Sequence, residues 1–97
     1  MAARLLLRER RVIAEGQFAE LVIWLLTNPV PGSAHTFKYR FAFVVDEVCV
    51  IRFDNEAGKG DHKHIGVEQV SYTFTSLARL IADFWIEVEA WRPDEQG

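Results

Sequence analysis

Alternating apolar and polar residues form the clearest pattern in this chain. Between residues 36 and 45, the odd positions are aromatic or apolar, whereas Thr36, Lys38 and Arg40 lie among the even ones. Successive side chains of a strand point to opposite faces, so this segment is predicted to be a strand with one aromatic face. Apolar runs bounded by turn-forming residues predict four more strands, over residues 5–13, 17–26, 48–53 and 70–74. A helix over residues 1–14 is the alternative at the start, because its Leu and Arg residues also favour helix.

A second periodicity begins after residue 75, where apolar residues recur at spacings of three and four. They are Leu77, Leu80, Ile81, Phe84, Val88 and Trp91. This spacing predicts an amphipathic helix over residues 76–91, capped by Thr75 or Ser76 and stopped by Pro93. We therefore expect an α+β fold, an antiparallel β-meander of about five strands with one C-terminal helix packed on the aromatic face. A chain of 97 residues suits a single domain, 1–97.

The turn between residues 45 and 48 decides which side chains share a face of the sheet. A three-residue loop over residues 46–48 would set Phe43 opposite Ile51, and Arg40 opposite Asp54. This register buries aromatic side chains against aliphatic ones and gathers Lys38, Arg40, Arg52 and Asp54 on the other face. It also places Cys49 on the apolar side, as a core thiol.

Charge is unevenly distributed along the chain. The net charge is −3, with +1 over residues 1–64 and −4 over residues 65–97. This balance argues against a protein that coats nucleic acid nonspecifically but allows a locally basic site. Arg4, Arg8, Arg10 and Arg11 give the first strand a basic character that suits phosphate or an acidic partner. One cysteine, no secretory signal and short apolar runs predict a cytoplasmic protein without a membrane span.

Chemistry is concentrated between residues 54 and 64. In an extended segment His62 and His64 point to the same side, and two imidazoles can act as general base and general acid on an RNA phosphodiester. Lys59, Arg40 or Lys38 could stabilise charge on the phosphate. The same pair with Asp61 or Asp54 could instead bind Zn²⁺ or Mn²⁺, and a solvated polar turn is a third interpretation.

We predict two groups of site residues and no bound metal or other cofactor, with a divalent metal at His62, His64 and Asp61 as the alternative. The catalytic candidates are His62, His64, Lys59, Asp61 and Asp54. The substrate-binding candidates are Lys38, Arg40, Arg52, Asn55 and His35.

Several segments together resemble the TumE family of toxin–antitoxin proteins. They are SAHTFKYR (residues 33–40), DNE (54–56), GKGDHKH (58–64) and YTF (72–74), followed by a helix rich in Leu, Phe and Trp. The resemblance implies a small bacterial toxin with a helix-turn-helix antitoxin as its partner. It supplies no mechanism, so two hypotheses stay open. One is an endoribonuclease toxin that uses the two histidines, and the other is a noncatalytic module that binds nucleic acid or protein.

Overall fold

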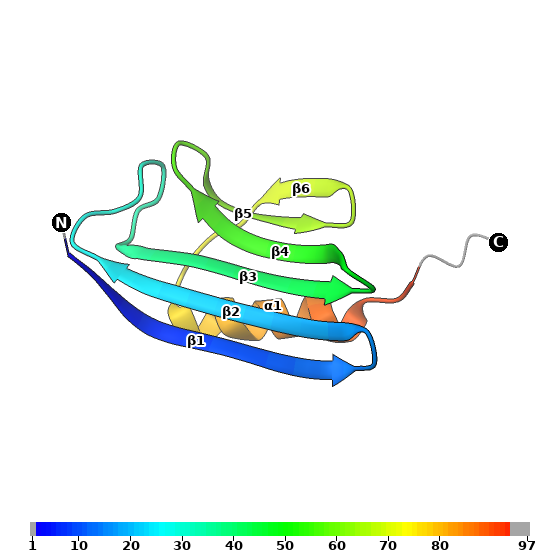
Figure 1. The fold of residues 1–97 in the computed structure, drawn as a ribbon. Helices are drawn as coiled ribbons and strands as arrows, with labels where there is room; N and C mark the ends of the chain where they lie inside the picture. Colours follow the sequence, from blue (N-terminus) through cyan, green and yellow to red (C-terminus); the bar gives the residue numbers. More distant parts are fainter. Residues whose placement is uncertain (1, 94–97) are drawn as a thin grey trace.

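A computed structural model describes residues 2–93 and contains one sheet and one helix (Figure 1). The strands are β1 (Ala3–Ala14), β2 (Gln17–Leu26), β3 (Phe37–Val45), β4 (Val48–Glu56), β5 (Gly60–Ile65) and β6 (Glu68–Ser71), and the helix is α1 (Leu77–Ala90). Each strand pairs antiparallel with the next, in the order β1-β2-β3-β4-β5-β6. The predicted α+β meander with one C-terminal helix is confirmed, and β1 excludes the alternative helix at the N-terminus.

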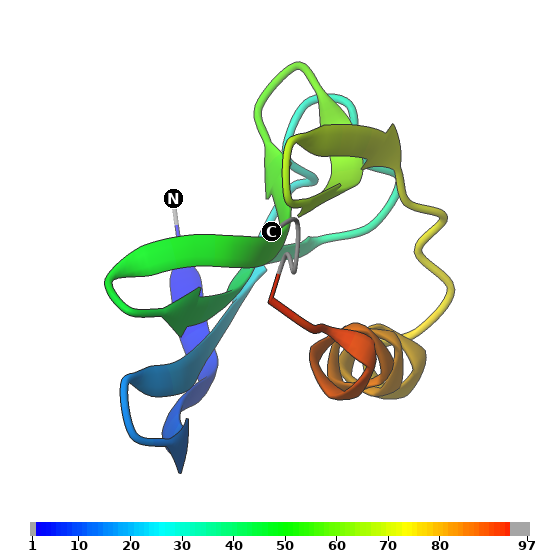
Figure 2. The same cartoon turned by 90° about the vertical axis from the view of Figure 1, so that its right-hand side faces the viewer.

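The main difference from the prediction is an additional strand. The sequence pattern predicted about five strands and did not indicate β5, which consists of GDHKHI and shows little apolar alternation. The strand expected over residues 70–74 lies earlier, at Glu68–Ser71, and pairs with β5. Residues 72–76 instead form the extended connection to α1 (Figure 2).

The register between β3 and β4 is the predicted one, but the turn that produces it is different. Arg40 lies opposite Asp54 and Phe43 opposite Ile51, whereas Val45 pairs directly with Val48 across a two-residue turn. Both turn residues, Asp46 and Glu47, have positive φ, as a tight hairpin turn requires. An irregularity after Phe43 then adds one residue to β4 and restores the predicted register. The same extra residue reverses the alternation before it, so Cys49 is exposed and the predicted core position was wrong.

The aromatic face of the sheet packs against α1, as predicted. Figure 2 shows the helix lying along one side of the twisted sheet. The ring of Phe84 meets Phe41 and Phe53 edge-on, with centroids 5.4 Å and 5.7 Å apart. Ser76 caps the helix by accepting a hydrogen bond from the backbone N–H of Arg79. The opposite sheet face, called the helix-free face below, is left without a covering element among residues 2–93.

Candidate functional site

Two strands bring the conspicuous charged residues together on the helix-free face. Asp54 on β4 lies directly opposite His62 on β5, and Arg52 lies opposite His64. Residues directly opposite each other in an antiparallel pair share a face, so all four side chains lie on one side of the sheet. The ring centroids of His62 and His64 are 5.0 Å apart, which confirms that the two histidines point the same way. We call these four residues the Asp54–His64 cluster.

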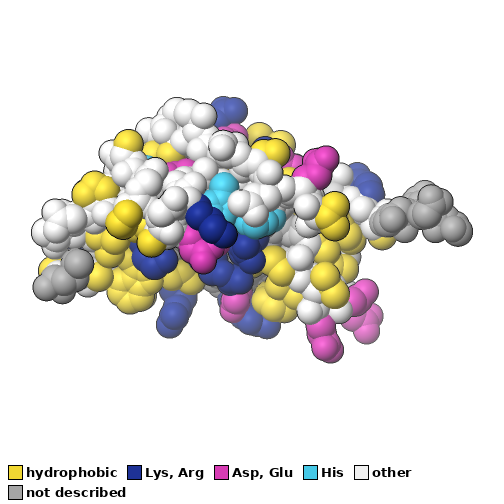
Figure 3. Space-filling model, turned by 90° about the horizontal axis from the view of Figure 1, so that it is seen from above, with side chains coloured by type: hydrophobic (Ala, Val, Ile, Leu, Met, Phe, Trp, Pro, Cys, Tyr) yellow, Lys and Arg dark blue, Asp and Glu magenta, His cyan; other side chains and the backbone are white. Residues whose placement is uncertain are grey.

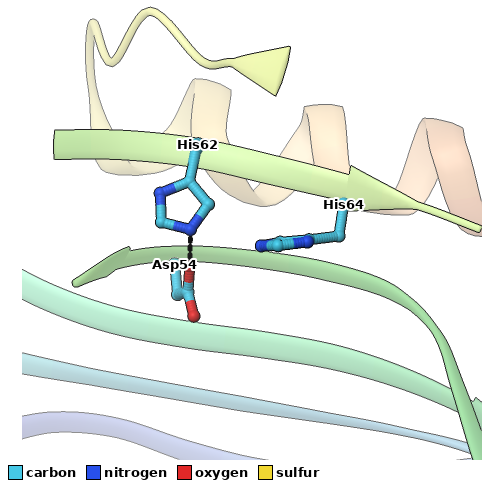
Figure 4. A group of neighbouring side chains, drawn as sticks. All are labelled: Asp54, His62 and His64. Atoms are coloured by element: carbon cyan, nitrogen blue, oxygen red, sulfur yellow. Dashed lines mark ion pairs between the residues drawn. The ribbon is translucent and has the colours of Figure 1, made fainter. Parts of the chain in front are cut away.

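His62 is held at both of its ring nitrogens. Its Nε2 lies 2.8 Å from Asp54 Oδ1 (Figure 4). Its Nδ1 lies 3.0 Å from the carbonyl oxygen of Gly60. Both neighbours are acceptors, so an imidazolium with two N–H groups satisfies both sides of the ring. The Nε2 contact is an ion pair of poor alignment, because neither Nε2 nor Oδ1 has a directional hydrogen bond within residues 2–93. His62 is only 4% exposed, which leaves it at the floor of the site.

His64 is more accessible and contacts a guanidinium group. Arg52 Nη2 lies 2.9 Å from His64 Nε2, and Arg52 Nε lies 3.2 Å from Asp54 Oδ2. Because arginine can only donate, Nε2 of His64 must accept and the ring proton must lie on Nδ1. Burial, followed by the positive charges of Arg52 and His62, lowers the pKa of His64 below the ordinary histidine value. His64 is thus a neutral imidazole near pH 7, with its basic nitrogen shielded by Arg52.

Further cations border the cluster. Lys38 and Arg40 are exposed on β3 and line a shallow hollow with Arg52 and Asp54. Figure 3 shows histidine side chains reaching this surface between basic and acidic groups. Lys59, in the turn between β4 and β5, is close enough for its charge to contribute to the lowered pKa of His64. Of the residues predicted to contact phosphate, Lys38 and Arg40 therefore border the cluster directly, whereas Lys59 lines a separate hollow with His35 and Asp61.

The donor atoms that could hold a metal ion belong to Asp54, His62 and His64. Their ligand atoms all lie within 4.8 Å of one another. One carboxylate and two imidazoles suit Zn²⁺ or Mn²⁺. However, the Arg52 guanidinium already contacts both Asp54 and His64, so a cation there would have to displace it. The alternative set of His62, His64 and Asp61 is not brought together, because Asp61 faces the opposite side of β5.

Asp61 and His35 instead form a second group on the helix side of the sheet. The Asp61 carboxylate accepts hydrogen bonds from Ser33 Oγ at 2.6 Å and Tyr39 Oη at 2.7 Å. His35 Nε2 donates to it at 2.7 Å, while His35 Nδ1 accepts from the backbone N–H of Phe37. Burial opposes ionisation of Asp61, but the three hydrogen bonds together lower the pKa of its carboxyl group. For Tyr39 the direction is the opposite, because burial and the hydrogen bond to Asp61 both raise the pKa of its hydroxyl group. Both ring nitrogens of His35 are engaged internally, which suits a structural role.

Asn55 also holds the fold together. It is fully buried, and its Oδ1 accepts from the backbone N–H of Tyr39 at 3.0 Å. Its amide nitrogen donates to the carbonyl of Phe37 at 2.7 Å and to Ser33 Oγ at 3.2 Å. These bonds continue the attachment of β3 to β4 beyond the last paired residues, Arg40 and Asp54. The predicted substrate contact by Asn55 would require breaking them.

The residues that hold Asp61 and His62 in place were not predicted from the sequence. Ser33 and Tyr39 anchor Asp61, the neighbour of His62, and the Gly60 carbonyl orients His62 itself. Gly32 and Gly60 touch backbone to backbone, since a Cβ on Gly32 would lie 2.8 Å from the nitrogen of Gly60. Strict alternation over residues 60–65 was the signal available in the sequence. It would have placed the side chains of Asp61 and His62 on opposite faces of the strand.

Comparisons with curated proteins and with solved structures found no significant match. Within residues 2–93, no helix has the length and apolar character needed to cross a membrane. The family model described as Toxin TumE matches residues 2–92, which is nearly the whole chain. The chain therefore belongs to the TumE toxin family.

Proposed function

We propose that this toxin acts on nucleic acid by cleaving RNA, with His64 and His62 transferring the protons. The observation that carries the proposal is the Asp54–His64 cluster, in which two imidazoles lie side by side, one beside a carboxylate and the other beside a guanidinium, and exposed cations border them. Such a pair fits cleavage of a phosphodiester by its own 2′-hydroxyl, where one group removes a proton and another supplies one. Arg52, Lys38 and Arg40 suit the charge that develops on the phosphate.

The geometry suggests an order of events. A bound phosphate draws the Arg52 guanidinium away from His64, which frees Nε2 to take the proton of the 2′-hydroxyl. The 2′-oxygen then forms a bond to phosphorus, and the bond from phosphorus to the 5′-oxygen breaks. His62 gives its Nε2 proton to the departing 5′-oxygen, which has to take the place of Asp54 Oδ1 at that nitrogen, while the Gly60 carbonyl holds the ring at Nδ1. The products are a 2′,3′-cyclic phosphate and a 5′-hydroxyl, and this step consumes no water or metal.

The test is incubation of the purified protein with several single-stranded RNAs, with and without EDTA. Cleavage in EDTA with cyclic-phosphate ends supports the proposal, and His64→Ala should reduce the rate by about 10²–10⁴-fold. Lys63→Gln is the matched control, because Lys63 lies between the two histidines but faces α1, where it pairs with Glu87. Cleavage that EDTA abolishes, or that survives His64→Ala with His62→Ala in a folded protein, would contradict it.

A noncatalytic binding module is the second candidate, and one observation favours it. His62 is 4% exposed with both ring nitrogens engaged, as expected for a residue that shapes a surface instead of reacting. In the same assay this protein would retain RNA on a gel without shortening it. Retention without cleavage of any RNA tested would favour this candidate.

A toxin family implies an antitoxin partner, and we propose a helix-turn-helix protein encoded by the adjacent gene. The toxin should stop growth when expressed alone, and coexpression of the neighbouring gene should restore growth. The two proteins should then purify together from a tagged toxin. Growth arrest that no adjacent gene relieves would contradict this partner.

A further inference from the structure

The strand pairing continues the cluster as a row of side chains across the sheet. Successive directly opposite residues are Arg8 on β1, Val22 on β2, Arg40 on β3, Asp54 on β4 and His62 on β5. All five lie on the helix-free face, because directly opposite residues share a face. Four strand spacings separate Arg8 from His62, which gives about 19 Å at roughly 4.8 Å per spacing. This row is long enough to accommodate several nucleotides of an extended strand.

Several cations along this row are uncompensated. Arg10 pairs with Glu20 and Arg52 with Asp54 on the same face. Arg8, Lys38 and Arg40, by contrast, form no ion pair within residues 2–93 and are exposed. Their charge therefore continues away from the histidines toward β1, although the whole chain is acidic. An anionic chain that enters the cluster would be attracted along this direction.

Trp24 lies beside the row on the same face. It is directly opposite Lys38 on β3 and Leu5 on β1, and it is only partly buried although α1 covers the other side of the sheet. The other two tryptophans serve the helix side, where Trp85 packs on Phe84 and Trp91 meets Phe43 edge-on. An indole beside a lysine on an uncovered sheet face suits the stacking of an unpaired base.

We propose that the helix-free face is a binding track for single-stranded RNA, in which Arg8 and Arg40 contact phosphates and Trp24 stacks on a base. This inference rests on the proposed function, because it takes the strand that crosses the cluster to be RNA. A single strand is favoured over a duplex, since a stacking platform needs a base whose face is free. The track extends the site to two residues, Arg8 and Trp24, that take no part in the proton transfers.

Binding can be measured separately from cleavage with a fluorescein-labelled 2′-O-methyl oligonucleotide, which lacks the attacking hydroxyl. In fluorescence anisotropy, Trp24→Ala should weaken binding about 5- to 150-fold, which corresponds to the ~1–3 kcal/mol of one base–aromatic stack. Trp24→Phe should recover most of the affinity, whereas Trp85→Ala on the helix side should leave it unchanged. A duplex of the same sequence should bind more weakly.

The role of Arg8 has its own matched control on the same strand. Arg8→Gln should flatten the plot of log affinity against log salt by about 0.7, the value for one phosphate contact on a single strand. Arg11→Gln should leave the slope unchanged, because Arg11 faces the helix side and lies over the ring of Trp85. Circular dichroism and urea denaturation identify any variant that loses its fold.

The outcomes separate this proposal from the proposed function. Binding that depends on Trp24 and Arg8 without any RNA cleavage supports the track and contradicts catalysis. Cleavage that depends on His64, with affinity unchanged in folded Trp24→Ala and Arg8→Gln, overturns the track alone. Two results together would overturn the track and identify this face as a protein interface. They are no binding of any oligonucleotide, and shielding of tryptophan fluorescence from a soluble quencher by the antitoxin in the unsubstituted protein but not in Trp24→Phe.

Discussion

Asp54 and Asp61 belong to one hydrogen-bonded strand pair, yet their carboxylates lie on opposite faces of the sheet. Asp54 lies opposite His62 on the helix-free face, whereas Asp61, the residue before His62, points toward Ser33 and Tyr39 on the helix side. The two acids therefore have separable effects. One contacts the groups proposed to react, and the other fastens the strand that carries them.

Replacing each acid by its amide should separate these effects. Asp54→Asn removes the negative charge beside His62 and Arg52, so RNA cleavage per folded molecule should fall by about 100-fold or more. Asp61→Asn removes a charged acceptor of three hydrogen bonds and should lower the free energy of unfolding by roughly 2–3 kcal/mol. The rate of RNA cleavage per folded molecule of Asp61→Asn should stay within about threefold of that of the unsubstituted protein. Equal losses of activity in the two folded variants would contradict this division.

The lowered pKa of His64 leads to a prediction about pH. By NMR titration, the pKa of His64 should lie below 6.5 and should rise in Arg52→Gln, because a neighbouring positive charge is removed. The unfolded chain then takes up the proton first as the pH falls. The free energy of unfolding should therefore be constant with respect to His64 above about pH 6.5 and decrease below it, down to the folded-state pKa.

Urea denaturation at pH 7.5 and pH 5.5 checks the sign of this effect. The loss of stability between the two pH values should be smaller in His64→Gln, which has no imidazole to titrate. An equal loss in both proteins would show that His64 does not contribute to the pH dependence of stability. A His64 pKa above 6.5 would contradict the proposal that this residue accepts the proton.

The contact between Gly32 and Gly60 gives a third prediction. Both Gly32 and Gly58 have positive φ, so alanine strains the backbone at either position. Only at Gly32 would the new Cβ also meet a backbone atom, the nitrogen of Gly60 at 2.8 Å, whereas Gly58 has open space around it. Gly32→Ala should thus be less stable than Gly58→Ala by about 1 kcal/mol or more. It should also impair RNA cleavage, because Gly60 orients His62.

The two glycine variants are best compared by thermal unfolding and by cleavage rate at a temperature where both are folded. If Gly32→Ala matched Gly58→Ala in both measurements, the loop around Gly32 would have no part in positioning His62.

The strands and helix that the sequence predicted correctly are those with a regular apolar period. The aromatic alternation of β3 and the three-four spacing of α1 each bury one face, and this burial also fixes Arg40 opposite Asp54. β5 lacks the signal because two of its three helix-side residues, Asp61 and Lys63, are polar and only Ile65 is apolar. Asp61 is satisfied by Ser33 and Tyr39, and Lys63 by Glu87, so that face needs few apolar residues.

The missing strand also explains which part of the site could not be predicted. Without β5 there was no partner strand to place His62 opposite Asp54, and Asp61 appeared to be an equally good neighbour for the histidines. Local spacing correctly placed His62 and His64 on one side. The role of Asn55 depends on the backbone of residues 37 and 39, which are distant in sequence and leave no local pattern.

The position of Arg52 gives a last prediction, which concerns metal binding. Asp54, His62 and His64 offer suitable donors, but the Arg52 guanidinium contacts Asp54 Oδ2 and His64 Nε2. Removing it in Arg52→Ala should free both atoms and take away a positive charge beside them, so Zn²⁺ binding should strengthen by about tenfold or more, the size of effect that residues beside metal ligands commonly have. Competition with a chromogenic chelator measures this affinity. Lys38→Ala is the control, since Lys38 is an exposed cation of the same hollow without a contact to these donors. Tight Zn²⁺ binding by the unsubstituted protein, lost in His64→Ala, would instead show that Arg52 yields to the metal and would favour a metal-dependent reaction at the same three residues.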